Sequence, residues 1–306
     1  MSDETLYVLD GHALVHRFYH APFANLSTRC TNCQGSGDVS ACKCPYCNGT
    51  GTEPTKATFL FVKSLLKLHR ERNPTYLALA MDTPRHKLER RAWTKHLDKP
   101  YKSSRKDDPN KWMLTAQLKR ISMIARALRV PVVRHPGWEA DDVIATLVEA
   151  FAGTNVRTVI VGKDKDLMQL LGNGVSMLDP VTGEEVHAGH VKEKFGVRPD
   201  QMRDYQALVG DSTDDVPGVR GIGPKHAAAL LQQYGDLKNV LANVLKMDMA
   251  CGIYINNQRD ELKLSRRLVT LNRNLDLAVE FEDLVCKLDW DRARPIFRAL
   301  GFKRWE

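Results

Sequence analysis

Acidic residues follow four predicted β-strands, at the point where each strand ends. The apolar, β-branched runs at 6–9, 75–81, 130–135 and 156–162 have the length and composition of strands. Ligands of open parallel sheets bind beyond the carboxyl ends of the strands, so these acids are predicted to converge on one spot. The acids are Asp10, Asp82, Glu139, Asp141, Asp142, Asp164 and Asp166.

Clustered carboxylates repel one another and are tolerated when divalent cations neutralise them. A single Asp would be an ordinary cap or turn residue, but capping does not explain acid at four strand ends. Oxygen ligands favour Mg²⁺ or Mn²⁺, and two such ions clamp the attacking and leaving oxygens in phosphodiester cleavage. His12, His16 and His20 recur every four residues and are interpreted as core or surface histidines.

Five of the seven cysteines lie in one short stretch, which contains the repeats CTNCQGSG (30–37) and CPYCNGTG (44–51). Four thiolates with this C-x2-C spacing predict a tetrahedral Zn²⁺ site. Redox sensing by free thiols is the alternative. The repeats are similar to the zinc repeats of DnaJ-type chaperones, but only over these residues. The predicted ligands are Cys30, Cys33, Cys44 and Cys47, with Cys42 as a spare.

Basic residues concentrate between Thr83 and Trp112, where ten Lys and Arg accompany four acids and three aromatic residues. This pattern predicts a flexible cationic segment that grips phosphates and stacks bases; a frayed, solvated helix is the alternative. The whole chain of 306 residues has a net charge of +8 and a pI near 9.1, which favours nucleic acid over an anionic membrane as the partner. No apolar run is long enough to span a membrane and no signal peptide is apparent, so a cytoplasmic protein is expected.

The elements that must position these residues alternate between strands and helices. Helices are predicted at 58–71, 113–128 and 141–151, so the expected fold is α/β with a mainly parallel, covered sheet. The strand signal fades near Pro180, and the expected domain boundary lies in LDPVTGEE (178–185). We expect an α/β domain over 1–179, with a cysteine insert at 28–53, and a helical region over 180–306.

The helical region contains VRGIGPKHAAALL, a Gly-x-Gly turn directly before an Ala-rich helix. Such a turn exposes backbone N–H groups that contact phosphate without reading sequence. With Arg220 and Lys225 beside it, the stretch 208–235 is predicted to be a helix–hairpin–helix DNA-binding element. Simple packing of two helices across a tight turn is the alternative.

Four blocks of the sequence resemble the 5′-nuclease family, above all the 5′–3′ exonuclease domain of bacterial DNA polymerase I and its stand-alone relatives. They are VLDGHALVHRFYHA, WEADDVIATL, GKDKDLMQLL and GDSTDDVPGVRGIGPKHAAALL. The resemblance implies a mixed central sheet of PIN-like or resolvase-like type, a helical arch at 83–112 and a C-terminal helix-three-turn-helix region. It also implies metal-dependent 5′–3′ exonuclease and 5′-flap endonuclease activity at single-strand/duplex junctions, giving 5′-phosphate products in replication or repair.

The resemblance also implies roles for individual residues. Asp211 and Asp214 join the seven acids as metal ligands. In the arch, Lys102 and Arg105 would stabilise charge on the scissile phosphate, and Tyr101 would stack on a base. The remaining DNA contacts would come from Arg17, Arg220, Gly221, Ile222, Gly223 and Lys225, with K⁺ held at the turn.

The implied partners are branched or 5′-ended DNA with a flap, nick, gap or overhang, and also the RNA of RNA–DNA hybrids. A separate DNA polymerase and a nucleoid-associated, bacterial setting are expected. The cysteine insert departs from the family pattern, and we interpret it either as a platform for the upstream duplex or as a structural staple. A non-catalytic DNA-binding protein and an RNA-directed nuclease are the competing classes.

Overall fold

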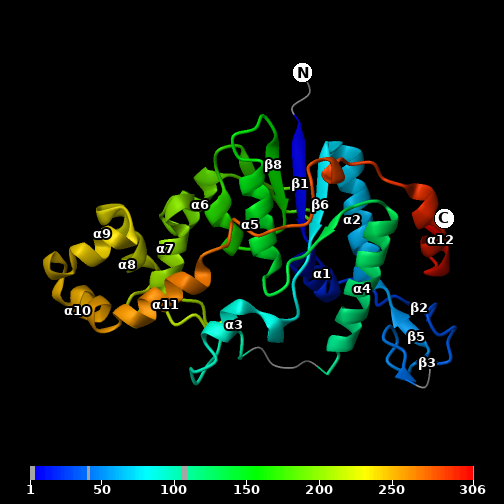
Figure 1. The fold of residues 1–306 in the computed structure, drawn as a ribbon, viewed down its shortest axis with the longest axis horizontal. Helices are drawn as coiled ribbons and strands as arrows, with labels where there is room; N and C mark the ends of the chain where they lie inside the picture. Colours follow the sequence, from blue (N-terminus) through cyan, green and yellow to red (C-terminus); the bar gives the residue numbers. More distant parts are fainter. Residues whose placement is uncertain (1–3, 40–41, 105–108, 306) are drawn as a thin grey trace.

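A six-stranded sheet forms the centre of the computed structural model, which describes residues 4–39, 42–104 and 109–305 (Figure 1). The strand order is β10-β9-β8-β1-β6-β7, with β10 antiparallel to β9 and the other pairs parallel. The predicted mixed, mainly parallel sheet is therefore confirmed, and the sequence pattern missed β9 and β10. The strands are β1 (Thr5–Asp10), β6 (Tyr76–Ala80), β7 (Val132–Val133), β8 (Arg157–Val161), β9 (Val175–Leu178) and β10 (Glu185–Val186).

Residues of β1 alternate between two apolar cores, one on each face of the sheet, as the two-residue period of a strand requires. Leu6 and Val8 pack beneath α5, whereas Tyr7 and Leu9 pack against α1, α2 and α4. Both faces are thus covered by helices. These are α1 (Gly11–His20), α2 (Lys56–Arg72), α4 (Lys111–Ala127) and α5 (Ala140–Ala150), near the predicted ranges.

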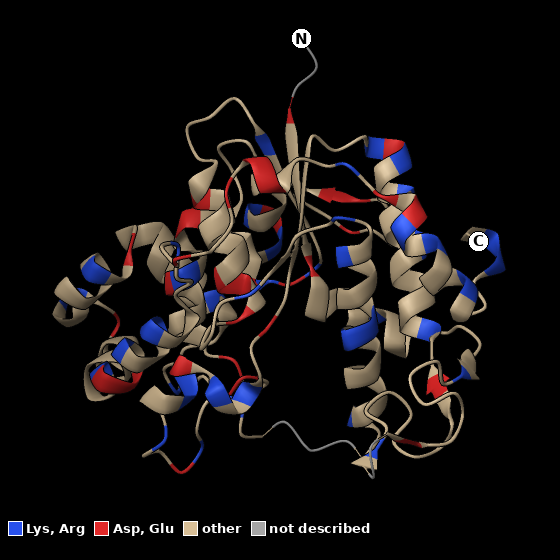
Figure 2. Ribbon diagram, turned by 45° about the vertical axis from the view of Figure 1, so that its right-hand side comes forward, with Lys and Arg blue, Asp and Glu red and all other residues tan. Residues whose placement is uncertain are grey.

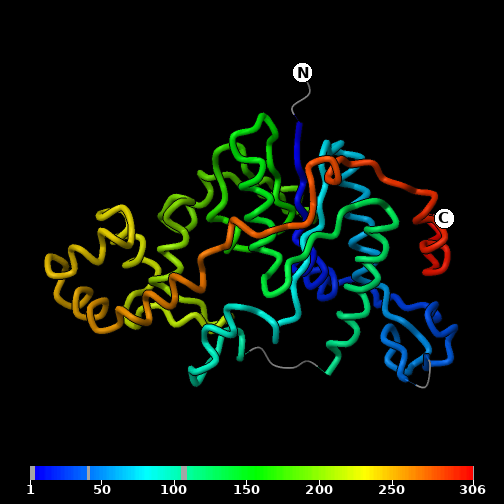
Figure 3. Tube along the Cα trace, in the orientation of Figure 1, coloured from blue at the N-terminus to red at the C-terminus, as the bar shows by residue number. Residues whose placement is uncertain are grey.

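The C-terminal third is helical and extends to one side of the sheet (Figure 1). Its α-helices are α6 (Ala188–Phe195), α7 (Pro199–Val209), α8 (Pro224–Tyr234), α9 (Leu237–Ala242), α10 (Met249–Asn257) and α11 (Arg259–Val269). After α11 the chain returns past α5 to α12 (Trp290–Ala299), near α2 and α4 (Figure 3). This return path ties the helical part to the sheet, because the Cys286 N–H donates to the Thr75 carbonyl at 2.8 Å.

Short elements complete the chain. The 3₁₀ turns are η1 (Arg85–Lys87), η2 (Asp166–Leu170), η3 (Val244–Lys246), η4 (Glu282–Leu284) and η5 (Lys303–Trp305). Helix α3 (Glu89–Trp93) belongs to the basic segment and lies below the sheet in Figure 1. The cysteine insert forms two small antiparallel sheets of two strands each. They pair β2 (Ser27–Arg29) with β5 (Thr52–Pro54) and β3 (Asp38–Val39) with β4 (Cys42–Lys43).

Candidate metal centre

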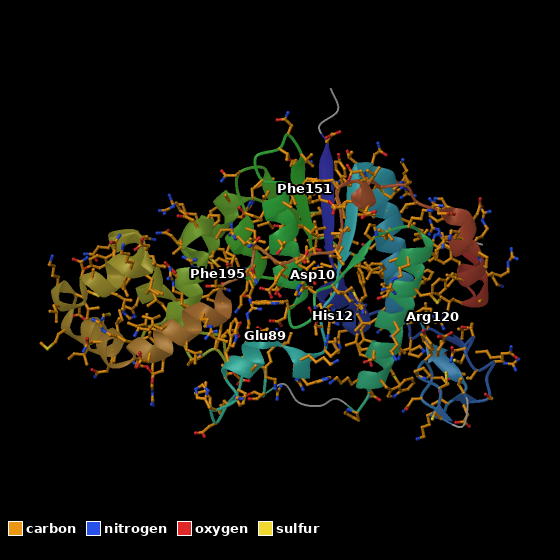
Figure 4. The ribbon with its side chains drawn as sticks, in the orientation of Figure 1. Asp10, His12, Glu89, Arg120, Phe151 and Phe195 are labelled. Carbon is orange, nitrogen blue, oxygen red and sulfur yellow. The ribbon has the colours of Figure 1, made fainter. Side chains whose placement is uncertain are left out.

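Three of the predicted acids meet at the carboxyl end of the sheet. Asp10 is the last residue of β1, Asp141 lies in the first turn of α5, and Asp164 follows β8. One carboxylate oxygen from each lies within 4.8 Å of the others, close enough to share a metal ion. The side chain of Asp10 is held in place because it accepts the Ala13 N–H at 3.1 Å and caps α1. Figure 4 shows Asp10 and His12 at this end of the sheet.

The electrostatics of this group favour cation binding. Burial and then the Asp164 carboxylate raise the pKa of Asp10 to about 8. The same two causes raise the pKa of Asp141 well above its usual range. Burial, Asp164 and Asp214 raise the pKa of Asp166 to about 7. Raised carboxyl pKa values mean that negative charge is costly here, and a divalent cation removes that cost.

Other predicted acids surround the group and are held by specific contacts. Asp82 Oδ1 accepts the Ala140 N–H at 2.8 Å, at the start of α5. Asp166 accepts a hydrogen bond from the Gln206 amide. Asp211 forms an ion pair with Lys165 at 2.7 Å. Lys165 stands between Asp164 and Asp166 in the loop after β8. Five strand-end or turn segments therefore contribute acids to one region.

The basic segment closes over these acids. Lys102 Nζ is hydrogen-bonded to Glu139 and lies 3.3 Å from Asp214 Oδ2. The Tyr101 hydroxyl donates to Glu139 Oε2 at 2.9 Å, and Tyr101 is only 5% exposed. Tyr101 is thus packed inward here, rather than presented for stacking on a base. Arg105, the other predicted arch residue, lies outside the described residues.

Asp142 is not among the three acids that share a site, and it forms a buried ion pair with Arg90. Nη1 and Nη2 of Arg90 donate to the two carboxylate oxygens of Asp142 at 2.6 and 2.7 Å, and Nη1 also donates to Glu139 Oε2 at 3.3 Å. Arg90 donates further to the carbonyls of Leu268 and Thr270. The pair therefore fastens α3 to α5 and to the end of α11. Sequence reasoning counted Arg90 only as one of ten basic residues.

Arg17, predicted to contact DNA, is also engaged in an ion pair. Its guanidinium donates to both carboxylate oxygens of Asp179, at 2.7 and 3.0 Å. Although burial opposes ionisation, hydrogen bonds from Arg17 hold the pKa of Asp179 far below its usual range. Arg17 therefore links α1 to the end of β9 in this structure.

The Gly-x-Gly turn lies exposed before α8, as a phosphate-binding turn requires. Gly221 has a φ of +98°, and an added Cβ would lie 2.7 Å from the Tyr254 ring. Gly223 caps α8, and Arg220 and Lys225 are exposed on either side, whereas Ile222 is buried. Only glycine fits at position 221, because the positive φ angle and the nearby Tyr254 ring both exclude a side chain.

The four predicted zinc ligands converge. The Sγ atoms of Cys30, Cys33, Cys44 and Cys47 lie within 4.8 Å of one another, and all four residues are buried. The repeat glycines Gly35, Gly37, Gly49 and Gly51 all have positive φ values, as tight knuckle turns require. The Gly37 N–H donates to Cys33 Sγ at 3.3 Å. Burial raises the pKa of the Cys33 thiol, but this bond and the adjacent thiols outweigh it and lower the pKa to about 6.

The insert is anchored to α4 by a buried contact that sequence reasoning did not find. Arg120 donates to Glu53 at 2.6 Å and to Thr31 at 2.9 Å, and its guanidinium lies 4.3 Å from the centre of the Tyr46 ring. Figure 4 shows Arg120 on the side of α4 next to the insert. The sequence does not predict this contact, because an Arg within an amphipathic helix is ordinarily expected on its exposed face.

Comparisons with known proteins decide the family. The sequence profile of the 5′–3′ exonuclease N-terminal resolvase-like domain matches residues 5–196, and that of the C-terminal SAM fold matches residues 197–292. The chain belongs to the 5′–3′ exonuclease family. It is therefore a metal-dependent nuclease, a hydrolase that binds DNA and metal ions.

Individual relatives agree with this assignment. A 5′–3′ exonuclease from Aquifex aeolicus is 33% identical over 93% of this chain and 87% of its own length. DNA polymerase I from Caldicellulosiruptor bescii is 36% identical over 82% of this chain but only 29% of its own length. The chain thus spans less than a third of the polymerase relatives that it matches.

Solved structures share the fold. The phage T5 5′-exonuclease with bound divalent metal ions is 21% identical, with a TM-score of 0.66 over 88% of this chain and 90% of that one. The catalytic core of Rad2 in complex with DNA is 12% identical, with a TM-score of 0.54 over 97% of this chain and 88% of that one. Within the described residues, no helix is both long and apolar enough to cross a membrane.

Proposed function

We propose that this 5′–3′ exonuclease is also a structure-specific 5′-flap endonuclease that hydrolyses DNA at single-strand/duplex junctions and leaves 5′-phosphate ends. The observation that carries the proposal is the convergence of Asp10, Asp141 and Asp164 beneath a cationic segment. Solved relatives with this fold include a phage T5 flap endonuclease in complex with DNA and metal ions. Figure 2 shows Lys and Arg on α3 and α4, the helices that flank the undescribed stretch.

The carboxylates would hold two divalent ions, Mg²⁺ or Mn²⁺. Asp10, Asp141 and Asp164 form the core of the site. The outer acids would complete it: Asp82, Glu139, Asp142, Asp166, Asp211 and Asp214. Of these, Asp142 would act through Arg90, which positions Glu139. When bound, such ions lower the pKa of water and stabilise charge on phosphate oxygens.

The chain's own groups would select and orient the DNA. The Gly221–Gly223 turn, with Arg220 and Lys225, would hold the duplex backbone, and its carbonyls could bind K⁺. Lys102, together with Arg105, would place positive charge beside the scissile phosphate, once Lys102 leaves its contact with Glu139. Tyr101 would then be released to stack on a base. Arg17 would support this surface through Asp179 rather than by a direct contact.

The test is cleavage of a 5′-flap DNA in Mg²⁺ by the wild type and by Asp141→Asn. We expect the variant to lose cleavage while it still binds the flap, and Asp291→Asn, at an exposed position of α12, to behave as the wild type. No cleavage by the wild type would favour the non-catalytic DNA-binding class. A matched RNA flap distinguishes DNA specificity from activity on the RNA of RNA–DNA hybrids.

Three further roles belong to the proposal. The cysteine insert would bind Zn²⁺ through Cys30, Cys33, Cys44 and Cys47, because their thiols converge at knuckle turns. The 5′-nuclease would act with a separate DNA polymerase, since several relatives carry this region within DNA polymerase I. Domains over 1–179 and 180–306 would divide the work between hydrolysis and duplex binding.

A further inference from the structure

A hollow lined by aromatic and basic residues lies beside the candidate metal centre. It has a volume of about 740 Å³ and is formed by α3, α7, the end of α11 and the segment that follows it. That volume falls in the range of about 300–1,000 Å³ that is typical of small-ligand pockets. Among the described residues, its lining includes none of the nine predicted acids, so the hollow is separate from the metal centre.

Two tryptophans supply flat aromatic surface in the hollow. Trp93 is on α3, and Trp138 precedes α5; their ring centres are 6.0 Å apart at an angle of 71°. Both rings are partly exposed. The Arg267 guanidinium lies 4.0 Å from the centre of the Trp93 ring. A guanidinium stacked in this way keeps its in-plane N–H groups available for an anion.

The charge in the hollow is positive. Three arginines line it: Arg203, Arg267 and Arg273. Arg203 pairs at 3.4 Å with the buried Asp204, a carboxylate that Arg266 also contacts at 2.9 Å. Within the described part of the chain, no carboxylate forms an ion pair with Arg267. Arg273 pairs with Glu149 at 3.4 Å, but both side chains are about half exposed, so this pair is weak. The lining has one acid, Asp200, which forms an exposed ion pair with Arg198 at 2.8 Å, so three arginines face one carboxylate.

The hollow is also joined to the metal centre through one layer of side chains. Arg90 donates to the Thr270 carbonyl at 2.9 Å and lies 5.6 Å from the centre of the Trp138 ring. Asp142 accepts the Asn272 N–H at 2.8 Å. Thr270, Asn272 and Trp138 all line the hollow, so its wall rests on the buried Arg90–Asp142 pair.

Aromatic rings beside Arg267, for which the described residues supply no ion pair, fit one class of ligand, a planar base that carries a phosphate. Trp93 is part of the basic segment that is proposed to receive the 5′ strand. We propose that this hollow binds one nucleotide of the single-stranded 5′ arm, at a subsite separate from the cutting site. This inference rests on the proposed flap-endonuclease function, and it makes the enzyme respond to the length of the arm.

The first experiment measures binding without cleavage, by intrinsic tryptophan fluorescence in the absence of divalent metal. We expect the single strand dT10 to quench the wild type and Trp138→Phe, and to bind about five- to tenfold more weakly to Arg267→Ala and Trp138→Ala. Arg298→Ala, an exposed arginine on α12, is the matched control and should bind as the wild type. Thermal melts establish that each variant is folded.

The arms of this experiment separate the sources of the ligand. For a subsite that binds one nucleotide of a strand, we expect dTMP to bind more weakly than dT10. Inorganic phosphate should not bind. Equal affinity for dTMP and dT10 would assign the hollow to a free nucleotide and overturn the proposal. Unchanged dT10 affinity in Arg267→Ala and Trp138→Ala would also overturn it.

The second experiment compares KM for 5′ flaps of one and of about twelve nucleotides in Mg²⁺. We expect the long flap to have the lower KM in the wild type and in Arg298→Ala, and this advantage to shrink at least about threefold in Arg267→Ala. An undiminished advantage in Arg267→Ala would contradict the subsite. Absence of cleavage by the wild type would overturn only the flap-endonuclease proposal, because the fluorescence arm reads the hollow directly.

Discussion

Replacing Arg90 by methionine should destabilise the protein strongly, because it leaves a carboxylate buried without its cation. Arg90 is 3% exposed and Asp142 is fully buried, and two short hydrogen bonds join them. Breaking a buried pair by removing one partner costs about 3–5 kcal/mol. Methionine keeps most of the apolar volume, so the loss reports the charge rather than a cavity.

The assay is urea or thermal unfolding of metal-free protein at neutral pH. A loss of about 3–5 kcal/mol corresponds to a fall in Tm of about 6–20 °C. Lys87→Met, an exposed residue of the same basic segment, is the control and should change stability by less than about 0.5 kcal/mol. The double variant Arg90→Met with Asp142→Asn should recover about 1–3 kcal/mol, since the stranded charge is then removed.

The result for Arg90→Met that would refute this reasoning is a loss below about 1 kcal/mol. It would mean that water reaches Asp142 or that α3 moves away from α5 in solution. Failure of the double variant to recover any stability would show that the lost hydrogen bonds to Leu268 and Thr270 dominate, and not the charge of Asp142.

The remaining predictions concern the metals, the insert and the turn. Because the pKa of Asp10 is raised to about 8, the metal-free protein should lose stability as pH rises from about 4 to 8. The increase in Tm that Mn²⁺ produces should grow over the same range. Asp10→Asn should reduce the pH dependence of both quantities. Cys33→Ser should reduce zinc content, measured by mass spectrometry, from one ion towards none, whereas exposed Cys42→Ser should not. Arg120→Met should expose the insert to protease cleavage at unchanged sheet stability. Gly221→Val should weaken duplex binding at least about tenfold in a gel-shift assay, with Gly153→Ala, at an open loop, as the control for a glycine with positive φ.

The acids at the strand ends could be placed from sequence because two simple rules fix them. The period of a strand identifies where it ends, and parallel strands bring their carboxyl ends to one edge. Asp10 and Asp164 follow these rules directly. The cysteine repeats are equally local, since their spacing and glycines specify the turns. The two strands after residue 174 were missed, because β9 is short and β10 is a two-residue edge pairing.

Contacts between distant segments could not be predicted from sequence. Arg90 and Asp142 are 52 residues apart, and Arg17 and Asp179 are 162 apart. In the sequence, a basic residue that faces solvent cannot be distinguished from one that pairs with a buried carboxylate. The inward position of Tyr101 is of the same kind, since its hydroxyl finds Glu139 only after the basic segment folds over α5.

The contact of Lys102 with Glu139 and Asp214 gives the acids a counter-ion that belongs to the chain itself. Folding of the sheet can therefore precede the arrival of any ion, because part of the negative charge is already balanced. The same ammonium group must be displaced, or share its oxygens, when a divalent cation enters. Under the proposed function, loading of the site and release of the basic segment would be one linked equilibrium, in which the ion concentration sets how often the segment opens for the strand.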